Sequence, residues 1–390
     1  MADENRMITF EYAKATYDEY KKQIVPNTKE AMTKSDIINY FNVDEQVIQN
    51  RTDNQLVPRI SFVGLLTDYS SFCYHFNHTV YSITIQPDNK ILVGGSFTRY
   101  KGVVANNIIR LNVDGTIDTT FNSGIGFDAL GSLSLPSDTN RSTVYAIKVQ
   151  SDGKILVGGN FSRYNGVERI SFCRLNANGT LDTSVNIGNT VTDFDYFGNS
   201  SVVVAGIIHD ILIQGSFAFI AGRYNSGSQD KISKVNLSTG ALVSTFSPNG
   251  IVPTGRSLTT DSTGRLYLGG ETSYYLGPEH NSPGYILRID TTTGVVDQNF
   301  KAGSVTTGSI KCIKYEPASN MILFGGSFTQ IFLPGSTSMT ADRLSRISLT
   351  GVIDTTFTAN INLDQSVFSV EAIEIDPLGK IIIGTLAQSL

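Results

Sequence analysis

Side chains of the kinds that catalyse reactions or bind metals are few and scattered in this chain of 390 residues. Among the histidines, His75 and His78 follow a predicted strand, where a role in a turn or in packing is favoured over metal binding, and His209 and His280 stand alone. The sequence contains no nucleophile elbow, no P-loop and no Cys/His cluster with metal-ligand spacing. We therefore predict that the protein is not an enzyme and that it carries no cofactor and no metal.

The cysteines and one acidic pair lead to the same interpretation. Cys73, Cys173 and Cys312 lie on different predicted strands without a spacing that suggests pairing, which favours buried thiols. Asp193 and Asp195 could hold Ca²⁺, but the segment TDFDYFG lacks EF-hand spacing, and a solvated loop is favoured.

Two charged positions recur along the chain. An aspartate stands in a repeated D-x-x-F element, at Asp118, Asp182, Asp297 and Asp354. A basic residue recurs as Arg59, Arg110, Arg174, Lys234, Arg288 and Arg346. Because a catalytic residue would occur once, we interpret the aspartates as capping or hydrogen-bonding groups of hairpins, and the basic residues as links between strands or repeats.

These positions belong to a repeated hairpin unit, of which VYSITIQPDNKILVGG, residues Val80 to Gly95, is the clearest copy. It has an alternating strand, a tight turn and a continuous apolar strand that ends in two glycines, so both faces of the second strand must be covered. Looser copies bring the number to six, at Val144 to Gly159, Ile207 to Gly222, Arg256 to Gly270, Ser309 to Gly326 and Ser369 to Thr385. We expect Gly94 and Gly158 to lie where the strand bends or where a neighbour crowds it.

A second hairpin follows each of these units, with IIRLNVDGTIDTTF, Ile108 to Phe121, as its clearest copy. The other five copies are Pro58 to Phe72, Cys173 to Val185, Ser233 to Phe246, Leu287 to Phe300 and Ser345 to Phe357. Four strands per repeat predict the blades of an all-β propeller. The first second-type hairpin and the last first-type hairpin are orphans that together complete one blade, so we predict a six-bladed β-propeller closed by pairing of its N- and C-terminal hairpins.

Two segments carry a resemblance to a known family. The pattern Q-x-D-G-K-I-L-V-G-G-x-F at Gln150 to Phe161, with R-L-N-x-D-G-T-x-D-x-x-F at Arg110 to Phe121, resembles the delta-60 repeat family of β-propellers. The resemblance extends from Pro58 to Thr385 and departs from the pattern at FAFIAG in the third copy and at Thr385 in the last. It implies the propeller fold. The family is known mainly from bacterial and bacteriophage proteins without an assigned chemistry, so it leaves the function open.

Residues 1–57 stand outside the repeat and are predicted to form a helical N-terminal arm before a propeller of residues 58–390. The apolar stripe of the arm consists of Phe10, Ala13, Tyr17, Tyr20 and Ile24, which follow helical spacing. Such a stripe must be covered, either by the chain's own propeller or by another subunit. We favour an assembly anchor, because a closed propeller satisfies its own edges.

Unequal connections also point to an interaction role. Turns inside hairpins are short, whereas long connections occur only between hairpins, at residues 122–143, 186–206, 271–284 and 329–343. In a propeller these connections emerge on one face, where recognition residues are commonly found, although tolerated insertions would give the same pattern.

Composition limits the partners. A net charge of −5 without a long basic run argues against nucleic acid, no apolar run reaches the length of a membrane span, and the N-terminus lacks the features of a secretory signal peptide. We predict a structural or host-attachment component of a bacteriophage virion, such as a tail or fibre protein, assembled in the host cytoplasm. Its partners would be other virion proteins and a host-surface glycan or protein. Alternatives are a bacterial protein- or glycan-binding propeller and, more weakly, a hydrolase or lyase propeller.

Overall fold

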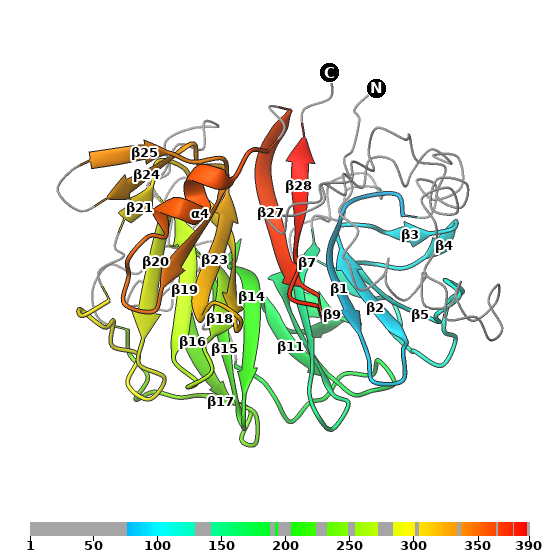
Figure 1. Ribbon diagram of the computed structural model, residues 1–390. Coiled ribbons are helices and arrows are strands. Elements are labelled where there is room, and N and C mark those ends of the chain that lie inside the picture. The colour runs from blue at the N-terminus through cyan, green and yellow to red at the C-terminus, as the bar shows by residue number, and fades with distance from the viewer. Residues whose placement is uncertain are drawn as a thin grey trace, which may run out of the picture.

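The computed structural model describes residues 76–128, 142–187, 192–193, 204–223, 232–248, 254–271, 284–300, 304–333, 337–363, 366–376 and 378–387. These residues form small antiparallel sheets and one short helix, α4 (Thr355–Asn360), so the fold is all-β as predicted (Figure 1). The predicted helical arm with its stripe from Phe10 to Ile24, and the hairpin Pro58 to Phe72, lie outside the described residues.

All six predicted first hairpins are present as antiparallel strand pairs. The pairs are β1 (Val80–Ile85) with β2 (Ile91–Gly95), β7 (Thr143–Val149) with β8 (Ile155–Asn160), β14 (Ile207–Gln214) with β15 (Phe217–Arg223), β18 (Thr254–Thr260) with β19 (Leu266–Glu271), β22 (Ile310–Glu316) with β23 (Met321–Gly326), and β27 (Val367–Ile375) with β28 (Ile381–Ala387). Their turns contain the left-handed residues that the sequence supplies, such as Asn89 at φ 63° and Gly153 at φ 82°.

A third strand extends five of these pairs outward. These strands are β5 (Ile108–Leu111), β11 (Phe172–Leu175), β16 (Ile232–Asn236), β20 (Gly284–Ile289) and β26 (Leu344–Ser348). We call each first hairpin together with its outer strands a blade. In the sixth blade, β28 pairs with no outer strand among the described residues.

The predicted fourth strand is shorter than the sequence suggested. In the third blade it is the two-residue strand β17 (Ala241–Leu242), and in four others it is a single bridge, as between Leu111 and Ile117. The reason is the aspartate that follows, because it turns the chain away from the sheet. Asp118 accepts from the backbone N–H of Thr120, and Asp354 caps helix α4 in the place of a continuing strand.

The core lies between the faces of neighbouring blades. Every residue of β2 is buried, as the continuous apolar run predicted, and Leu92 shares a cluster with Val144 and Ile147 of the next blade. The first strands of successive blades contact each other in order, β1 with β7, then β14, β18, β22 and β27. These six strands therefore line the inner side of the arrangement.

The glycine pair that stands near the end of four of the six second strands is required by this packing. A Cβ atom on Gly94 would lie 2.5 Å from Cγ1 of Val144, and one on Gly158 would lie 2.6 Å from Cγ2 of Ile208, so the predicted crowding is confirmed. The second glycine is crowded by its own hairpin, since a Cβ on Gly95 would collide with the backbone oxygen of Thr79.

Short accessory strands join neighbouring blades. The segment that follows the first blade, β6 (Phe127–Asp128), pairs with β9 (Arg163–Tyr164) of the second blade, and β9 also pairs with β10 (Val167–Glu168). The first blade has the equivalent pair β3 (Arg99–Tyr100) and β4 (Val103–Val104). In the other half, β21 (Ser304–Thr306) pairs with both β20 and β24 (Gln330–Leu333), and β24 pairs with β25 (Thr337–Thr340). One further pair, β12 (Thr192–Asp193) with β13 (Val204–Ala205), completes the described strands.

Candidate functional site

The recurring basic residues and aspartates join strands and blades, as predicted. Arg110 Nε and Lys90 Nζ lie 2.7 and 2.8 Å from Oδ2 of Asp118, and Arg110 Nη1 donates to the backbone oxygen of Ala177 in the next blade. Burial alone would raise the pKa of Asp118, but hydrogen bonds from Lys90, Thr120 and Arg110 hold it below its usual range.

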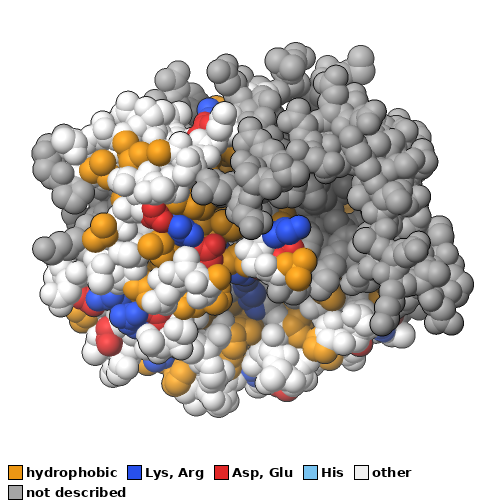
Figure 2. Space-filling model, viewed as in Figure 1, with side chains coloured by type: hydrophobic (Ala, Val, Ile, Leu, Met, Phe, Trp, Pro, Cys, Tyr) orange, Lys and Arg blue, Asp and Glu red, His pale blue; other side chains and the backbone are white. Residues whose placement is uncertain are grey.

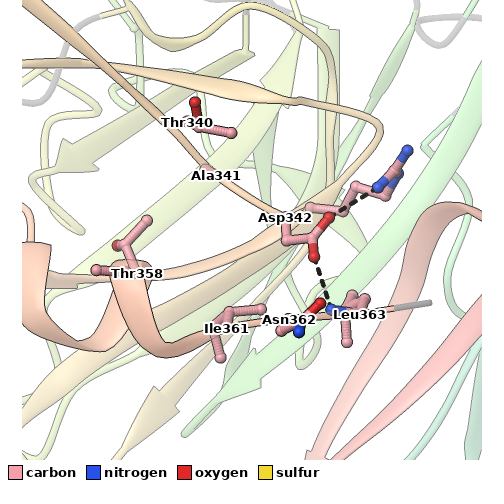
Figure 3. Close-up of a pocket in the computed structure, with 9 residues that line it drawn as sticks. Thr340, Ala341, Asp342, Thr358, Ile361, Asn362 and Leu363 are labelled. Carbon is pink, nitrogen blue, oxygen red and sulfur yellow. Dashed lines mark hydrogen bonds and ion pairs between the residues drawn. The ribbon is translucent and has the colours of Figure 1, made fainter. Parts of the chain in front are cut away.

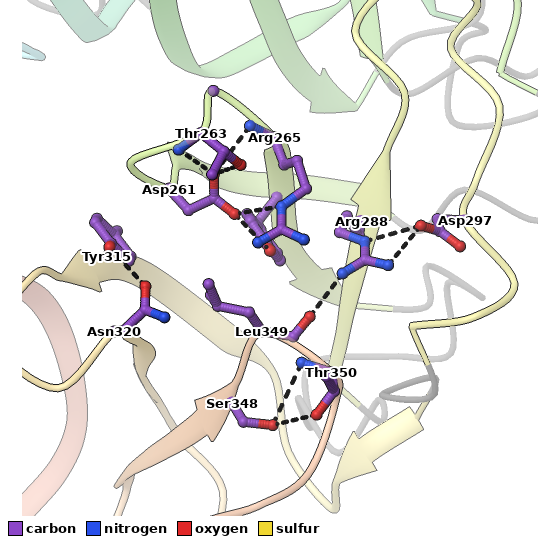
Figure 4. A network of polar contacts seen from close by, with 12 residues as sticks. Asp261, Thr263, Arg265, Arg288, Asp297, Tyr315, Asn320, Ser348, Leu349 and Thr350 are labelled. Atoms are coloured by element: carbon purple, nitrogen blue, oxygen red, sulfur yellow. Dashed lines mark hydrogen bonds and ion pairs between the residues drawn. The ribbon is translucent and has the colours of Figure 1, made fainter.

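The same links recur around the molecule. Arg174, Lys234 and Arg288 each donate to a backbone oxygen of the following blade, at Leu237, Thr291 and Leu349 respectively. Figure 4 shows Arg288 between Asp297 of its own blade and Leu349 of the next. Because these basic residues and aspartates make the same contacts in successive blades, they stabilise the fold. We therefore do not consider them a candidate functional site.

Another repeated position changes its residue type from blade to blade, and it lies on the inner side of the blades. Each first hairpin contains a register shift near the start of its inner strand, for example between Val80 and Ser82, which leaves one residue without a partner opposite it. Such a bulge turns a side chain away from the regular alternation of the strand. The last hairpin has two register shifts, at Phe368 and at Glu371. Six bulged residues, one from each first hairpin, are Tyr81, Tyr145, His209, Arg256, Lys311 and Glu371. We call them the axial cluster.

One part of the axial cluster is aromatic. The ring centroids of Tyr81 and Tyr145 lie 4.8 Å apart, and the ring of Tyr145 meets the imidazole of His209 edge-on at 5.2 Å. Tyr81 remains 42% exposed, so the aromatic surface is open to a ligand.

The other part is charged. Arg256 donates to Nε2 of His209 at 3.0 Å and pairs with the carboxylate of Glu271, which stands at the end of β19. Lys311 lies 4.0 Å from the second oxygen of Glu271, and the hydroxyl of Ser369 donates to Glu371.

Burial and neighbouring charges fix the protonation of this cluster. Burial, with Arg256, Lys311 and Arg223 nearby, lowers the pKa of His209 well below its usual value, so His209 is neutral at pH 7. Burial and Arg256 also lower the pKa of Lys311. Burial would raise the pKa of Glu271, but Arg256 and Lys311 outweigh it and hold that pKa below its usual value.

Lys311 is the least satisfied member. Its side chain is 19% exposed, and within the described part of the chain its ammonium makes one ion pair at 4.0 Å and no hydrogen bond. An ammonium has three donors, and a half-buried one without close acceptors is suited to a ligand that supplies them.

A cavity of about 510 Å³ lies near the turn end of the inner strands. Its lining includes Thr84, Lys148, Ile211 and Leu258, and Lys148 pairs with Asp210 at 3.6 Å. The inner side of the blades is thus hollow at its lower end and carries the cluster where the strands begin.

A second hollow, of about 530 Å³, lies between the end of β25 and the residues after α4 (Figure 3). Its polar groups satisfy each other, because Asp342 pairs with Arg343 and accepts the backbone N–H of Leu363. It is a less suitable ligand site than the axial cluster.

Most residues singled out in the sequence have no place in the cluster. Cys173 and Cys312 are buried thiols, as predicted, and burial raises the pKa of both. His78 is exposed on the surface, and Asp193 lies in β12. The remaining candidates, His75, His280, Cys73 and Asp195, lie outside the described residues.

His209 is the exception, because the fold brings this isolated histidine into the axial cluster. Sequence reasoning missed the cluster, although one signal was available. The bulged position holds Tyr, Tyr, His, Arg, Lys and Glu in the six copies of the first hairpin, while the residue before it is apolar or glycine in every copy. Within the described ranges, no group of three or more His, Cys, Asp or Glu side chains is placed to hold a metal ion.

Comparison with known proteins supports the fold and is silent on the chemistry. Residues 86–121 and 150–184 match a family described as a domain of unknown function (DUF5122) beta-propeller. The matched spans lie within the first two blades and support a propeller repeat. No curated protein matches the chain. In the part of the chain that the structure describes, no helix has the length and apolar character needed to cross a membrane.

Proposed function

We propose that this protein is a non-enzymatic binding propeller, that its ligand site is the axial cluster, and that it acts as a component of a bacteriophage particle. The observation that carries the proposal is the contrast between two kinds of repeated position. Residues that link the blades keep their chemistry, whereas the bulged residues differ in all but one pair and converge on the inner side. Loss of repetition at a convergent, partly open position favours recognition of an asymmetric ligand.

Six blades closed into a ring are part of this proposal. The segment that follows the predicted hairpin Pro58 to Phe72 supports closure. Phe76 bridges to Tyr100 and packs 4.6 Å from its ring, just as Phe127, which follows the first blade, packs 4.6 Å from Tyr164 of the second. Residue 76 therefore meets the first blade as the end of a preceding blade would, and that blade is the one whose β28 needs an outer strand.

Binding is favoured over catalysis because the charges are paired with each other. Arg256 is held by both His209 and Glu271, an arrangement that fixes the shape of the site and leaves Lys311 as the donor for a ligand. A hydrolase or lyase propeller is the second candidate. It is favoured by the shifted pKa values of Tyr145, His209 and Lys311 within one cluster, since such groups gather at active sites.

The proposal can be tested by presenting the full-length protein to arrays of neutral glycans, acidic glycans and peptides. Lys311→Met and Tyr81→Ala should each remove the strongest signals. Lys314→Met is the matched control, because Lys314 lies on the same strand and pairs with Glu374 at 2.7 Å, away from the cluster. Thermal melting shows whether each variant folds. Signals that survive both axial substitutions, or no signal on any array, would overturn the proposal, and conversion of a bound compound to products would establish the enzyme.

The virion setting rests on the predicted arm. Its apolar stripe needs a cover, and a surface with few charged residues suits an assembled particle. Figure 2 shows Lys, Arg, Asp and Glu side chains scattered on the visible face without a continuous patch of either sign. Tyr17→Glu combined with Tyr20→Glu should leave the melting temperature of the isolated protein unchanged and exclude it from particles. A lower melting temperature would show instead that the arm covers its own propeller.

A further inference from the structure

We propose that the cavity at the turn end of the inner strands is a second ligand site, separate from the axial cluster, and that it binds a neutral aliphatic alcohol through the side-chain amide of Gln150. The cavity has a volume of about 510 Å³, and its lining includes residues of the first four blades. Pockets of about 300 to 1,000 Å³ with an apolar lining and few polar groups are the usual sites for small molecules.

Gln150 differs from its counterparts in the other blades because its amide oxygen has no partner. The residue five positions after the bulged residue is polar in all six first hairpins, and in five of them its side chain makes a hydrogen bond. These five residues are Gln86, Gln214, Asp261, Glu316 and Asp376. In Gln150 the atom Oε1 is buried and accepts no hydrogen bond within the described part of the chain.

The recurring basic residue of the second blade does not supply the missing donor. Arg110 Nη1 lies 3.4 Å from Oε1 of Gln86, whereas Arg174 Nη1 donates to the backbone oxygen of Leu237 at 2.7 Å. A buried acceptor without a donor is unfavourable, and a ligand that supplies the donor removes that penalty. Gln150 is only partly buried and lines the cavity, so a rotation about its soft χ3 torsion turns the amide oxygen toward a ligand and breaks no hydrogen bond of that oxygen.

The other polar groups of the described lining favour a ligand without charge. Lys148 is its charged residue and pairs with Asp210 at 3.6 Å, and the hydroxyl of Thr84 donates to the backbone oxygen of Ile147. An amine would bring a second cation beside Lys148. A hydroxyl is a neutral donor that adds little polar surface to an apolar molecule, so it suits Gln150.

The rest of the described lining determines the body of the ligand. It consists mainly of aliphatic side chains and includes Ile85, Val149, Ile213 and Leu258. Such a surface favours an apolar ligand through the hydrophobic effect. Because no described lining residue is aromatic, an aromatic ligand would find no ring to pack against. The ligand is therefore a compact aliphatic molecule with one hydroxyl group.

The experiment measures the affinity of the full-length protein for menthol and for menthone at pH 7 by ligand-observed NMR titration. Both probes have the same branched aliphatic ring, but menthol has a hydroxyl group where menthone has a carbonyl, which cannot donate. We expect menthol to bind about tenfold more tightly than menthone, as one added hydrogen bond of ordinary strength allows. Gln150→Met keeps the length of the side chain and should remove this preference by weakening menthol binding about tenfold.

Gln214→Met is the matched control, because Gln214 holds the same position in the third blade and donates to Gly264. It should leave menthol affinity within about twofold of wild type but lower the melting temperature, since it removes a hydrogen bond. Gln150→Met should not lower the melting temperature, because the oxygen that it removes has no partner. A lower melting temperature for Gln150→Met would show that Gln150 is bonded in the free protein and would overturn the argument.

The remaining contrary outcomes are equally direct. Equal affinities for menthol and menthone would overturn the hydrogen bond from the alcohol, and no binding of menthol up to its solubility limit would overturn the site. Menthol binding that Gln150→Met leaves intact would also overturn the site. Lys311→Met should not change menthol affinity, and a loss in that variant would place the alcohol at the axial cluster. The proposed function does not depend on these results, because its own test uses the axial substitutions.

Discussion

The contact between the first glycine of one blade and the inner strand of the next allows a quantitative test of the packing. In Gly158→Ala the new Cβ would lie 2.6 Å from Cγ2 of Ile208 and 3.1 Å from Cδ1 of Ile211. Both partners are fully buried, so neither can move into solvent. Overpacking of this kind costs about 1 to 3 kcal/mol of unfolding free energy.

A double-mutant cycle identifies the cause of that cost. Ile208→Ala removes the Cγ2 atom that the new Cβ would meet and should itself cost about 2 to 5 kcal/mol through the cavity it leaves. When the two substitutions are combined, the alanine at position 158 occupies part of that cavity. We therefore expect the double variant to be more stable than the sum of the single effects by about 1 to 2 kcal/mol, within the range of coupling found for contacting residues.

Urea denaturation followed by circular dichroism and by tyrosine fluorescence measures the three variants, and coincident transitions show that the chain unfolds as one unit. A Gly158→Ala variant as stable as wild type would mean that the strand can move aside. Strictly additive losses would mean that the cost arises in the backbone of β8 and not at Ile208. Either result would refute the packing argument.

Three further predictions concern the links between blades and the closure. Asp118→Asn should lower the unfolding free energy by about 1.5 to 3 kcal/mol at pH 7. Because the pKa of Asp118 is lower in the folded than in the unfolded protein, the difference in stability between the variant and wild type should narrow as the pH falls below about 4. A difference in stability that does not change with pH would contradict this prediction. Arg174→Met should lower the melting temperature more than Lys154→Met. Both side chains pair with Asp182, but only Arg174 also donates to the next blade, at Leu237. Equal decreases in melting temperature would argue against this link between blades. If the ring closes, Gly384 packs against Val80 as Gly94 packs against Val144. Gly384→Ala should then destabilise the wild-type protein but have almost no effect on stability in a Val80→Ala background. Equal losses of stability in both backgrounds would argue for an open array of blades.

The sequence predicted the parts of the fold that depend on local chemistry. Asn89 and Gly153 set the turns, the alternating and continuous apolar runs set the inner and second strands, and the glycine pairs marked the tight contacts between blades. The fourth strand was overestimated because short β-rich segments were given more weight than the capping aspartate that ends them. Asp118 and Asp354 show that competition, since each binds backbone N–H groups just after it.

The axial cluster could not be predicted from motifs, because its members meet only through the radial arrangement of the blades. His209 and Lys311 are separated by 102 positions and belong to no shared pattern. A bulge is also hard to read from a sequence, since it adds a residue without changing the apolar pattern on either side. Even where Thr385 replaces the second glycine, the register shift between Val370 and Ala372 persists and Glu371 is turned out of the alternation.

Variation among the repeats is of two kinds, and the difference between them supports a functional role for the axis. In the third blade Ala221 stands where other blades have the first glycine, and the residue it meets in the next blade is Gly255 instead of a branched side chain, with a Cβ on Gly255 only 2.8 Å from that of Ala221. That change is compensated across a contact, as packing requires. No such compensating change accompanies the bulged residues Tyr145, His209 and Arg256, which differ in size around the axis. The side chain of a bulged residue packs on neither face of its own sheet. Variation that packing does not demand is open to selection by a ligand, and this is the physical reason to look for the ligand of this protein at the axial cluster.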